Sequence, residues 1–151
     1  MHLIPVHMVL ALLATTLSTA FPIQSMNPQF SLSARAASQT VSCAGSSACN
    51  IALSSTLSWA CNRAHTKIDP TATYMTGRRT RDTGVCARMY ASAFGCGIFV
   101  SGPRGCSRSG AEMIQAVSDI RTSGKCAICG WVQEKSGGDG CKIKIDYVSG
   151  C

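Results

Sequence analysis

Histidine and acidic residues are scarce in this chain of 151 residues, which has 3 histidines and 7 acidic residues. Only His65 lies beyond the apolar N-terminal run, and we interpret it as a loop residue. A single histidine rules out a Cys₂His₂ zinc site. It also leaves a secreted ribonuclease without its usual pair of acid–base groups. Because the acids are scattered singly and no G-x-S-x-G or H-E-x-x-H motif occurs, we expect neither an enzyme nor a bound cofactor or metal.

Aromatic residues are also few, at 6% of the sequence. They do not alternate with basic residues as they do in proteins that bind single-stranded nucleic acid. The sequence has no strongly amphipathic basic helix of the kind that lies on membranes. No N-x-S/T sequon occurs, so N-glycosylation is not expected.

One long apolar run is present, "LIPVHMVLALLATTLSTAF", and small residues close it at Ser18-Thr19-Ala20. This pattern predicts a signal peptide over 1–20 and a secreted, extracellular protein. A membrane anchor is the alternative, but serine and threonine residues shorten the apolar core below the span of about 20 residues that a bilayer needs.

The segment 21–40 has two prolines and many small or polar residues, but no cysteine and a single charge, Arg35. We interpret it as a flexible spacer or pro-segment with little to bury. One folded domain is expected over 41–151.

All ten cysteines fall in this domain. An even number of cysteines in a secreted chain predicts a disulfide framework, here of five bridges with no free thiol. The ten are Cys43, Cys49, Cys61, Cys86, Cys96, Cys106, Cys126, Cys129, Cys141 and Cys151.

The C-x-x-C of "GKCAICG" has two further interpretations, a zinc site and a redox couple. Zinc would need a second close pair, and Cys43 and Cys49 are more widely spaced than usual. A redox couple lies at a helix N-terminus, where the helix dipole lowers the thiol pKa. Here a predicted helix precedes the cysteines, so the dipole disfavours thiolate. We therefore expect Cys126 and Cys129 to be ends of two structural bridges.

That helix is predicted over "SGAEMIQAVSDIRTSG". Ser109 and Glu112 form a capping box, Gly124 is expected to end the helix, and three apolar residues recur at helical spacing: Met113, Val117 and Ile120. A second helix is expected around 49–63, with an apolar face that is formed by Ile51, Leu53, Leu57 and Trp59.

Strands are predicted over 95–102, 141–148 and 71–75, with a turn-rich loop over 134–141. The segment 141–148 alternates, with Ile143, Ile145 and Tyr147 on one side and charged residues on the other, as in an antiparallel strand with one solvated face. Together these elements predict an α+β domain in which two helices cover a small antiparallel sheet.

Three motifs resemble the fungal killer-toxin family of the KP-four type: "VSCAGSSAC", "GKCAICG" and "KIKIDYVSGC". The resemblance covers about 41–151 and implies an α/β sandwich, in which two antiparallel helices cover an antiparallel sheet with several disulfides. It further implies that Cys43 pairs with Cys126 and Cys49 with Cys129. Cys96 and Cys141 have no obvious counterparts in the family, and we expect them to bridge neighbouring strands. The pairing of Cys61, Cys86, Cys106 and Cys151 is left open.

The resemblance implies killing of competing fungi by block of calcium channels. A basic surface suits such a target, and the formal charge of this chain is +7. Three of these charges lie in "GRRTRDTGVC": Arg78, Arg79 and Arg81, expected on an exposed loop. Cation channels carry carboxylate rings, which arginine binds bidentately. Lys142 and Lys144 form a second basic patch, and Arg104 and Arg108 could form a third. The family carries a lysine where this chain has Gly84.

We therefore expect a monomeric, secreted toxin-like protein that inhibits growth of competing fungi or host cells through a membrane protein such as a voltage-gated calcium channel. The alternative is a cationic effector or antimicrobial module that binds an acidic surface without channel activity. Binding to nucleic acid is not expected. The plain structural explanation of the charges is that they keep a secreted protein soluble.

Overall fold

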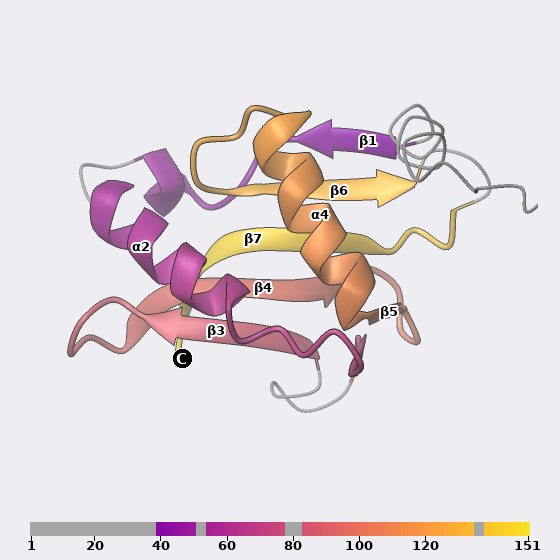
Figure 1. Ribbon diagram of the computed structural model, residues 1–151, viewed down its shortest axis with the longest axis horizontal. Coiled ribbons are helices and arrows are strands. Elements are labelled where there is room, and N and C mark those ends of the chain that lie inside the picture. Colours follow the sequence, from indigo (N-terminus) through magenta and orange to yellow (C-terminus); the bar gives the residue numbers. More distant parts are fainter. Residues whose placement is uncertain (1–38, 51–53, 78–82, 135–137) are drawn as a thin grey trace, which may run out of the picture.

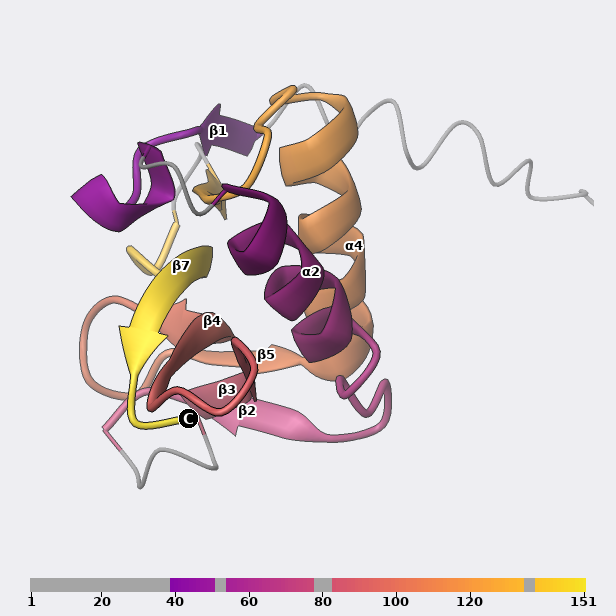
Figure 2. The same ribbon diagram turned by 90° about the vertical axis from the view of Figure 1, so that its left-hand side faces the viewer.

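The computed structural model describes residues 39–50, 54–77, 83–134 and 138–151. The expected signal peptide (1–20), nearly all of the spacer (21–40) and the arginines of 78–81 lie outside the described residues. Within the described part, a sheet is covered on one face by two helices (Figures 1 and 2). This is the α+β fold that the sequence predicts.

The main sheet has five strands, and every neighbouring pair is antiparallel. In spatial order they are β1 (Gln39–Ser42), β6 (Gly130–Glu134), β7 (Lys142–Ser149), β4 (Phe94–Ser101) and β3 (Gly84–Arg88). A second sheet pairs two short strands, β2 (Thr73–Met75) and β5 (Ser107–Ser109). The helices are η1 (Ser47–Asn50), α2 (Ser54–His65) and α4 (Gly110–Thr122).

The alternation along β7 decides which face of the sheet is covered. Ile143 and Ile145 point toward the helices and are 5% and 0% exposed. Their neighbours on β4, Val100 and Ile98, lie opposite them in register and are also buried. Since side chains alternate along a strand, Lys142, Lys144 and Asp146 project from the other face. The sequence therefore predicts correctly which side of β7 faces the core.

Helix α4 begins at the predicted capping box. The Ser109 side chain accepts a hydrogen bond from the Glu112 amide, and the Glu112 carboxylate accepts one from the Ser109 amide. Met113, Val117 and Ile120 are buried against the sheet, as expected. The helix ends as predicted near Gly124, but the residue with positive φ is Lys125, at 54°. Gly124 is needed for space, because a Cβ there would lie 2.5 Å from Val41 Cγ1.

Helix α2 differs from its prediction at both its start and its exposed side. It begins at Ser54, and the 3₁₀ turn η1 precedes it, with residues 51–53 outside the described part. The Cys49–Cys129 bridge ties this turn to the segment that leads into β6. Leu57 is buried as expected, whereas Trp59, which we had placed on the apolar face, is 41% exposed. The buried face instead uses the small residues Ala60 and Ala64.

Five disulfides join all ten cysteines. Cys43 pairs with Cys126 and Cys49 with Cys129, as the family resemblance implies. The other bridges are Cys61–Cys96, Cys86–Cys151 and Cys106–Cys141.

The expected Cys96–Cys141 bridge is wrong. In the β4–β7 register Cys96 lies opposite Tyr147, which is six residues along the chain from Cys141 and so roughly 20 Å away along a strand. Cys96 instead faces the helices and reaches Cys61 on α2.

Candidate binding site

The sheet surface that faces away from the helices, here called the open face, gathers two of the predicted basic residues with two aromatic rings. The register places Lys144 of β7 between Trp131 of β6 and Phe99 of β4. Lys142 lies two residues earlier on the same side of β7. Both rings and both lysines are partly buried.

Each lysine of the open face lies over a ring. Lys142 Nζ is 4.4 Å from the centroid of Trp131, and Lys144 Nζ is 5.9 Å from the centroid of Phe99. Such cation–π contacts contribute about 0.5–1 kcal/mol at exposed sites. The rings therefore hold the ammonium groups close to the sheet surface while leaving them accessible to solvent and to anionic partners.

Asp146 is the buried charged residue of the described part, at 8% exposure. Its Oδ2 lies 3.2 Å from Lys144 Nζ. Its Oδ1 accepts hydrogen bonds from the Ser46 amide at 2.8 Å and the Tyr147 amide at 2.9 Å. The carboxylate thus pins the loop before η1 to the sheet and positions Lys144.

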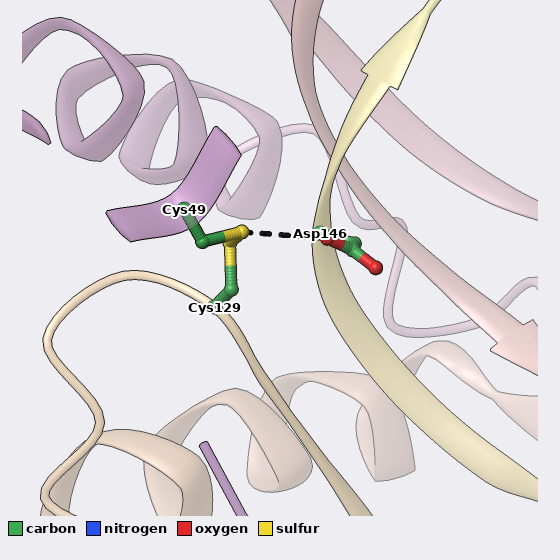
Figure 3. A group of neighbouring side chains, drawn as sticks. All are labelled: Cys49, Cys129 and Asp146. Atoms are coloured by element: carbon green, nitrogen blue, oxygen red, sulfur yellow. Dashed lines mark hydrogen bonds between the residues drawn. A yellow bond between two sulfur atoms is a disulfide. The ribbon is translucent and has the colours of Figure 1, made fainter. Parts of the chain in front are cut away.

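The sulfur of Cys49 lies 3.4 Å from Asp146 Oδ1 (Figure 3). This sulfur belongs to the Cys49–Cys129 bridge and carries no hydrogen, so the contact is a close approach and not a hydrogen bond. The same bridge also denies these thiolates to a metal ion, as does the Cys106–Cys141 bridge beside Asp139. Neither group of cysteines and a carboxylate is therefore a metal centre.

A shallow hollow of ≈ 650 Å³ lies on the open face. Its walls include the loop at Gly45 and Ser46, the rings of Trp131 and Phe99, and both lysines. Its shape and its cations suit an acidic group of a larger partner better than an enclosed small molecule.

The other predicted basic residues are placed differently. Arg78, Arg79 and Arg81 lie outside the described residues, so the arginine loop stays a prediction. Arg104 lies against Gly77, at the start of that loop, since a Cβ on Gly77 would be 3.3 Å from Arg104 Cγ. Arg108 holds Asp139 bidentately, at 2.9 and 3.0 Å, so it is not part of a third basic patch with Arg104.

The described acids mostly support local structure. Asp69 accepts hydrogen bonds from the amide and hydroxyl of Thr71, which lower the pKa of the Asp69 carboxyl. The Arg108 guanidinium lowers the pKa of the Asp139 carboxyl. Carboxyl groups with lowered pKa stay ionised at neutral pH, which makes them poor general acids. His65, which we expected in a loop, is instead the last residue of α2.

The aromatic half of this site has no local signal in the sequence. Trp131 and Phe99 lie far apart in the chain, and only the pairing of β6 and β4 with β7 brings them beside the lysines. The alternation of β7 did place Lys142, Lys144 and Asp146 on one face.

The chain belongs to the MU117 meiotically up-regulated gene family, whose model matches residues 41–151. The matched range coincides with the domain expected from the cysteines. No curated protein matches the sequence. The family's description refers to regulation in meiosis and names no activity. In the part of the chain that the structure describes, no helix combines the length and hydrophobicity of a bilayer-spanning segment.

Proposed function

We propose that this protein is a secreted, non-enzymatic binding protein of the killer-toxin type, which inhibits cell growth by blocking calcium uptake. Its target would be a membrane protein with exposed carboxylates, such as a voltage-gated calcium channel. The contact surface would include the open face, and Arg78, Arg79 and Arg81 are further candidates from the sequence alone. The observation that carries the proposal is the pair of ring-supported lysines, Lys142 and Lys144, on a scaffold with five disulfides.

Three further properties support this proposal. Many disulfides are typical of secreted proteins, because they persist in oxidising compartments. The formal charge of +7 favours attraction to acidic surfaces. The three motifs that resemble the killer-toxin family all lie in the domain that displays the open face.

The test uses the purified, oxidised protein on fungal cells, with calcium uptake and growth as the two measurements. We expect both to fall and growth to recover when calcium is added. Lys142→Gln and Lys144→Gln should each weaken inhibition by about fivefold, the equivalent of roughly 1 kcal/mol per exposed ion pair. Lys125→Asn is the matched control: it removes one exposed charge after α4, and asparagine tolerates the positive φ there.

Two outcomes would contradict the channel proposal. If calcium uptake is unchanged while the protein still binds cells, the cationic effector without channel activity is the better description. If Lys125→Asn weakens inhibition as much as the open-face variants, only net charge matters. Binding that depends on net charge should also fall steeply as salt rises.

A further inference from the structure

The hairpin that joins β3 and β4 lies at one end of the molecule (Figure 1), and exposed aromatic residues lie in it and on the neighbouring helix α2. Among the described residues, the large hydrophobic side chains that are exposed are Trp59 at 41%, Tyr90 at 77% and Phe94 at 46%. Tyr90 and Phe94 lie in this hairpin, and Tyr90 stacks on Trp59 of α2 with ring centroids 5.5 Å apart. Phe94 stacks on Tyr147 at 5.6 Å. Neighbouring rings therefore hold the exposed ones in place.

The backbone at Tyr90 is strained as well as exposed. Its φ is +48°, a region that bulky residues rarely adopt. Backbone hydrogen bonds hold the turn, from the Met89 amide to the Phe94 carbonyl and from the Ser92 amide to the Met89 carbonyl. The Tyr90 ring is 77% exposed, so its burial contributes little free energy to offset the backbone strain. The stability of the fold alone therefore does not explain a tyrosine at this position.

Cations surround the same rings. Arg63 Cζ lies 4.9 Å from the ring centroid of Trp59. A hollow of ≈ 290 Å³ lies beside it, and Arg63, Lys67 and Arg88 are among its lining residues. None of the described residues that line it has a carboxylate side chain. The hairpin-end patch therefore combines exposed rings with positive charge, and is defined by Trp59, Arg63, Lys67, Arg88, Tyr90 and Phe94.

The cations of the patch are exposed, and hydrogen bonds from the charged groups of Lys67 and Arg88 hold two of them in place. Lys67 Nζ donates to the Cys86 carbonyl at 2.8 Å, and Arg88 Nε donates to a backbone carboxylate oxygen of Cys151. Each of these groups has further N–H donors that can meet an anion. The contacts hold the charges beside the rings along edge strand β3.

We propose that the hairpin-end patch docks on a membrane surface that contains anionic phospholipid. Tryptophan and tyrosine favour the membrane–water interface, because their rings are apolar and their edges polar. Each lysine or arginine near an anionic lipid surface adds about 1 kcal/mol of attraction, or fivefold in affinity. The β3–β4 hairpin lies at one end of the molecule (Figure 1), and Trp59 and Tyr90 line the open hollow there together with the cations. The exposed rings beside the cations favour a lipid surface over an acidic peptide, because the membrane–water interface takes up aromatic rings and its anionic lipids attract the charges. This inference does not rest on the channel proposal, since it needs no protein target.

The first experiment measures binding of the oxidised protein, purified after secretion, to vesicles of phosphatidylcholine with and without phosphatidylserine. We expect binding at least tenfold tighter when phosphatidylserine is present. Tyr90→Asn removes the ring with a residue that tolerates positive φ, and should weaken binding severalfold. Arg63→Gln and Arg88→Gln should each weaken it about fivefold. Lys142→Gln is the matched control on the open face and should leave vesicle binding unchanged.

The two tryptophans allow a second measurement, because Trp59 lies in the patch and Trp131 on the open face. With Trp131→Phe, the remaining Trp59 fluorescence should shift to the blue on vesicles with phosphatidylserine. With Trp59→Phe, Trp131 fluorescence should not shift. Glycerophosphoserine in solution should cause neither shift, which separates a lipid surface from its free headgroup.

Several outcomes would overturn the proposal. These are an unshifted Trp59, a shift confined to Trp131, or equal losses for Arg63→Gln and Lys142→Gln. So would tight binding of polyglutamate to the patch without binding to vesicles, since it would assign the patch to an acidic protein. Because the vesicles contain no channel, failure here is distinct from failure of the calcium-uptake experiment.

Discussion

The two tryptophans of this chain lie in regions that combine rings and cations differently. On the open face, Lys142 covers Trp131, and a buried carboxylate positions the neighbouring Lys144. At the hairpin-end patch, Arg63 lies over Trp59, and none of the described residues that line the adjoining hollow has an acidic side chain.

The rings of the open face are partly buried, whereas Tyr90 in the patch is 77% exposed. The open face thus presents charge at fixed positions, which suits recognition of individual acidic groups. The patch presents apolar area that gains free energy when it leaves water. The same residue types therefore serve two different kinds of contact, and three substitutions test that distinction.

The largest loss of stability is expected from a substitution in the hydrophobic core that supports both regions. Ile145→Ala removes a side chain with 0% exposure from the covered face of β7. We expect the free energy of unfolding to fall by about 2–5 kcal/mol, since the cavity cannot fully collapse. Denaturant unfolding followed by tryptophan fluorescence measures this loss. Lys142→Ala, on the opposite face of the same strand, removes a cation–π contact and should cost under about 1 kcal/mol. Equal losses for the two variants would contradict the assignment of the faces.

A smaller effect, confined to one region, is expected from Asp146→Asn. The substitution removes the charge that accepts two amide hydrogen bonds and pairs with Lys144. We expect a loss of roughly 1–2 kcal/mol, because hydrogen bonds to charged groups are stronger than neutral ones. The fluorescence of Trp131 should change, and that of Trp59 should not, in the single-tryptophan backgrounds. A change at Trp59 would show that the two regions are coupled.

The smallest effect concerns an ion pair that neither region uses. Arg108 lowers the pKa of the Asp139 carboxyl, so the folded-state pKa lies below the unfolded value of about 3.9. The resulting stability is present above that value and is lost as pH falls through the folded-state pKa. Because the Asp139 side chain is 51% exposed, the contribution should stay below about 0.5 kcal/mol.

In Asp139→Asn, the free energy of unfolding should therefore fall less steeply as the pH is lowered between about pH 5 and 2. Denaturant unfolding at several pH values measures this dependence. Vesicle binding and calcium uptake at neutral pH should stay unchanged. If the free energy of unfolding of the variant instead fell more steeply with decreasing pH, the predicted direction of the effect would be wrong.

Local signals in the sequence predicted β4, β7 and α4, because each has a strong pattern of its own. The capping box at Ser109 starts α4, and strict alternation marks β7. Strands β1, β3 and β6 have at most five residues and little alternation, so their pairing with longer neighbours decides their structure. Trp59 was misplaced because helical spacing alone does not distinguish the centre of a buried face from its margin.

Contacts between distant residues were less accessible to sequence reasoning. The open face needs three strands in register, and the hairpin-end patch needs α2 beside the β3–β4 turn. The bridge from Cys96 was predicted wrongly for the same reason: without the β4–β7 register, nothing in the local sequence shows that Cys96 faces α2.

The two neighbouring bridges Cys43–Cys126 and Cys49–Cys129 make oxidative folding depend on a choice between isomers. The same four sulfurs could cross over, joining Cys43 to Cys129 and Cys49 to Cys126, with similar loop lengths and so similar chain entropy. What separates the two isomers is the β1–β6 ladder, in which Val41 lies opposite Val132 and Ser42 opposite Trp131. A slip of that short ladder during oxidative folding would yield a fully oxidised but misfolded protein, whose mass would not reveal the error.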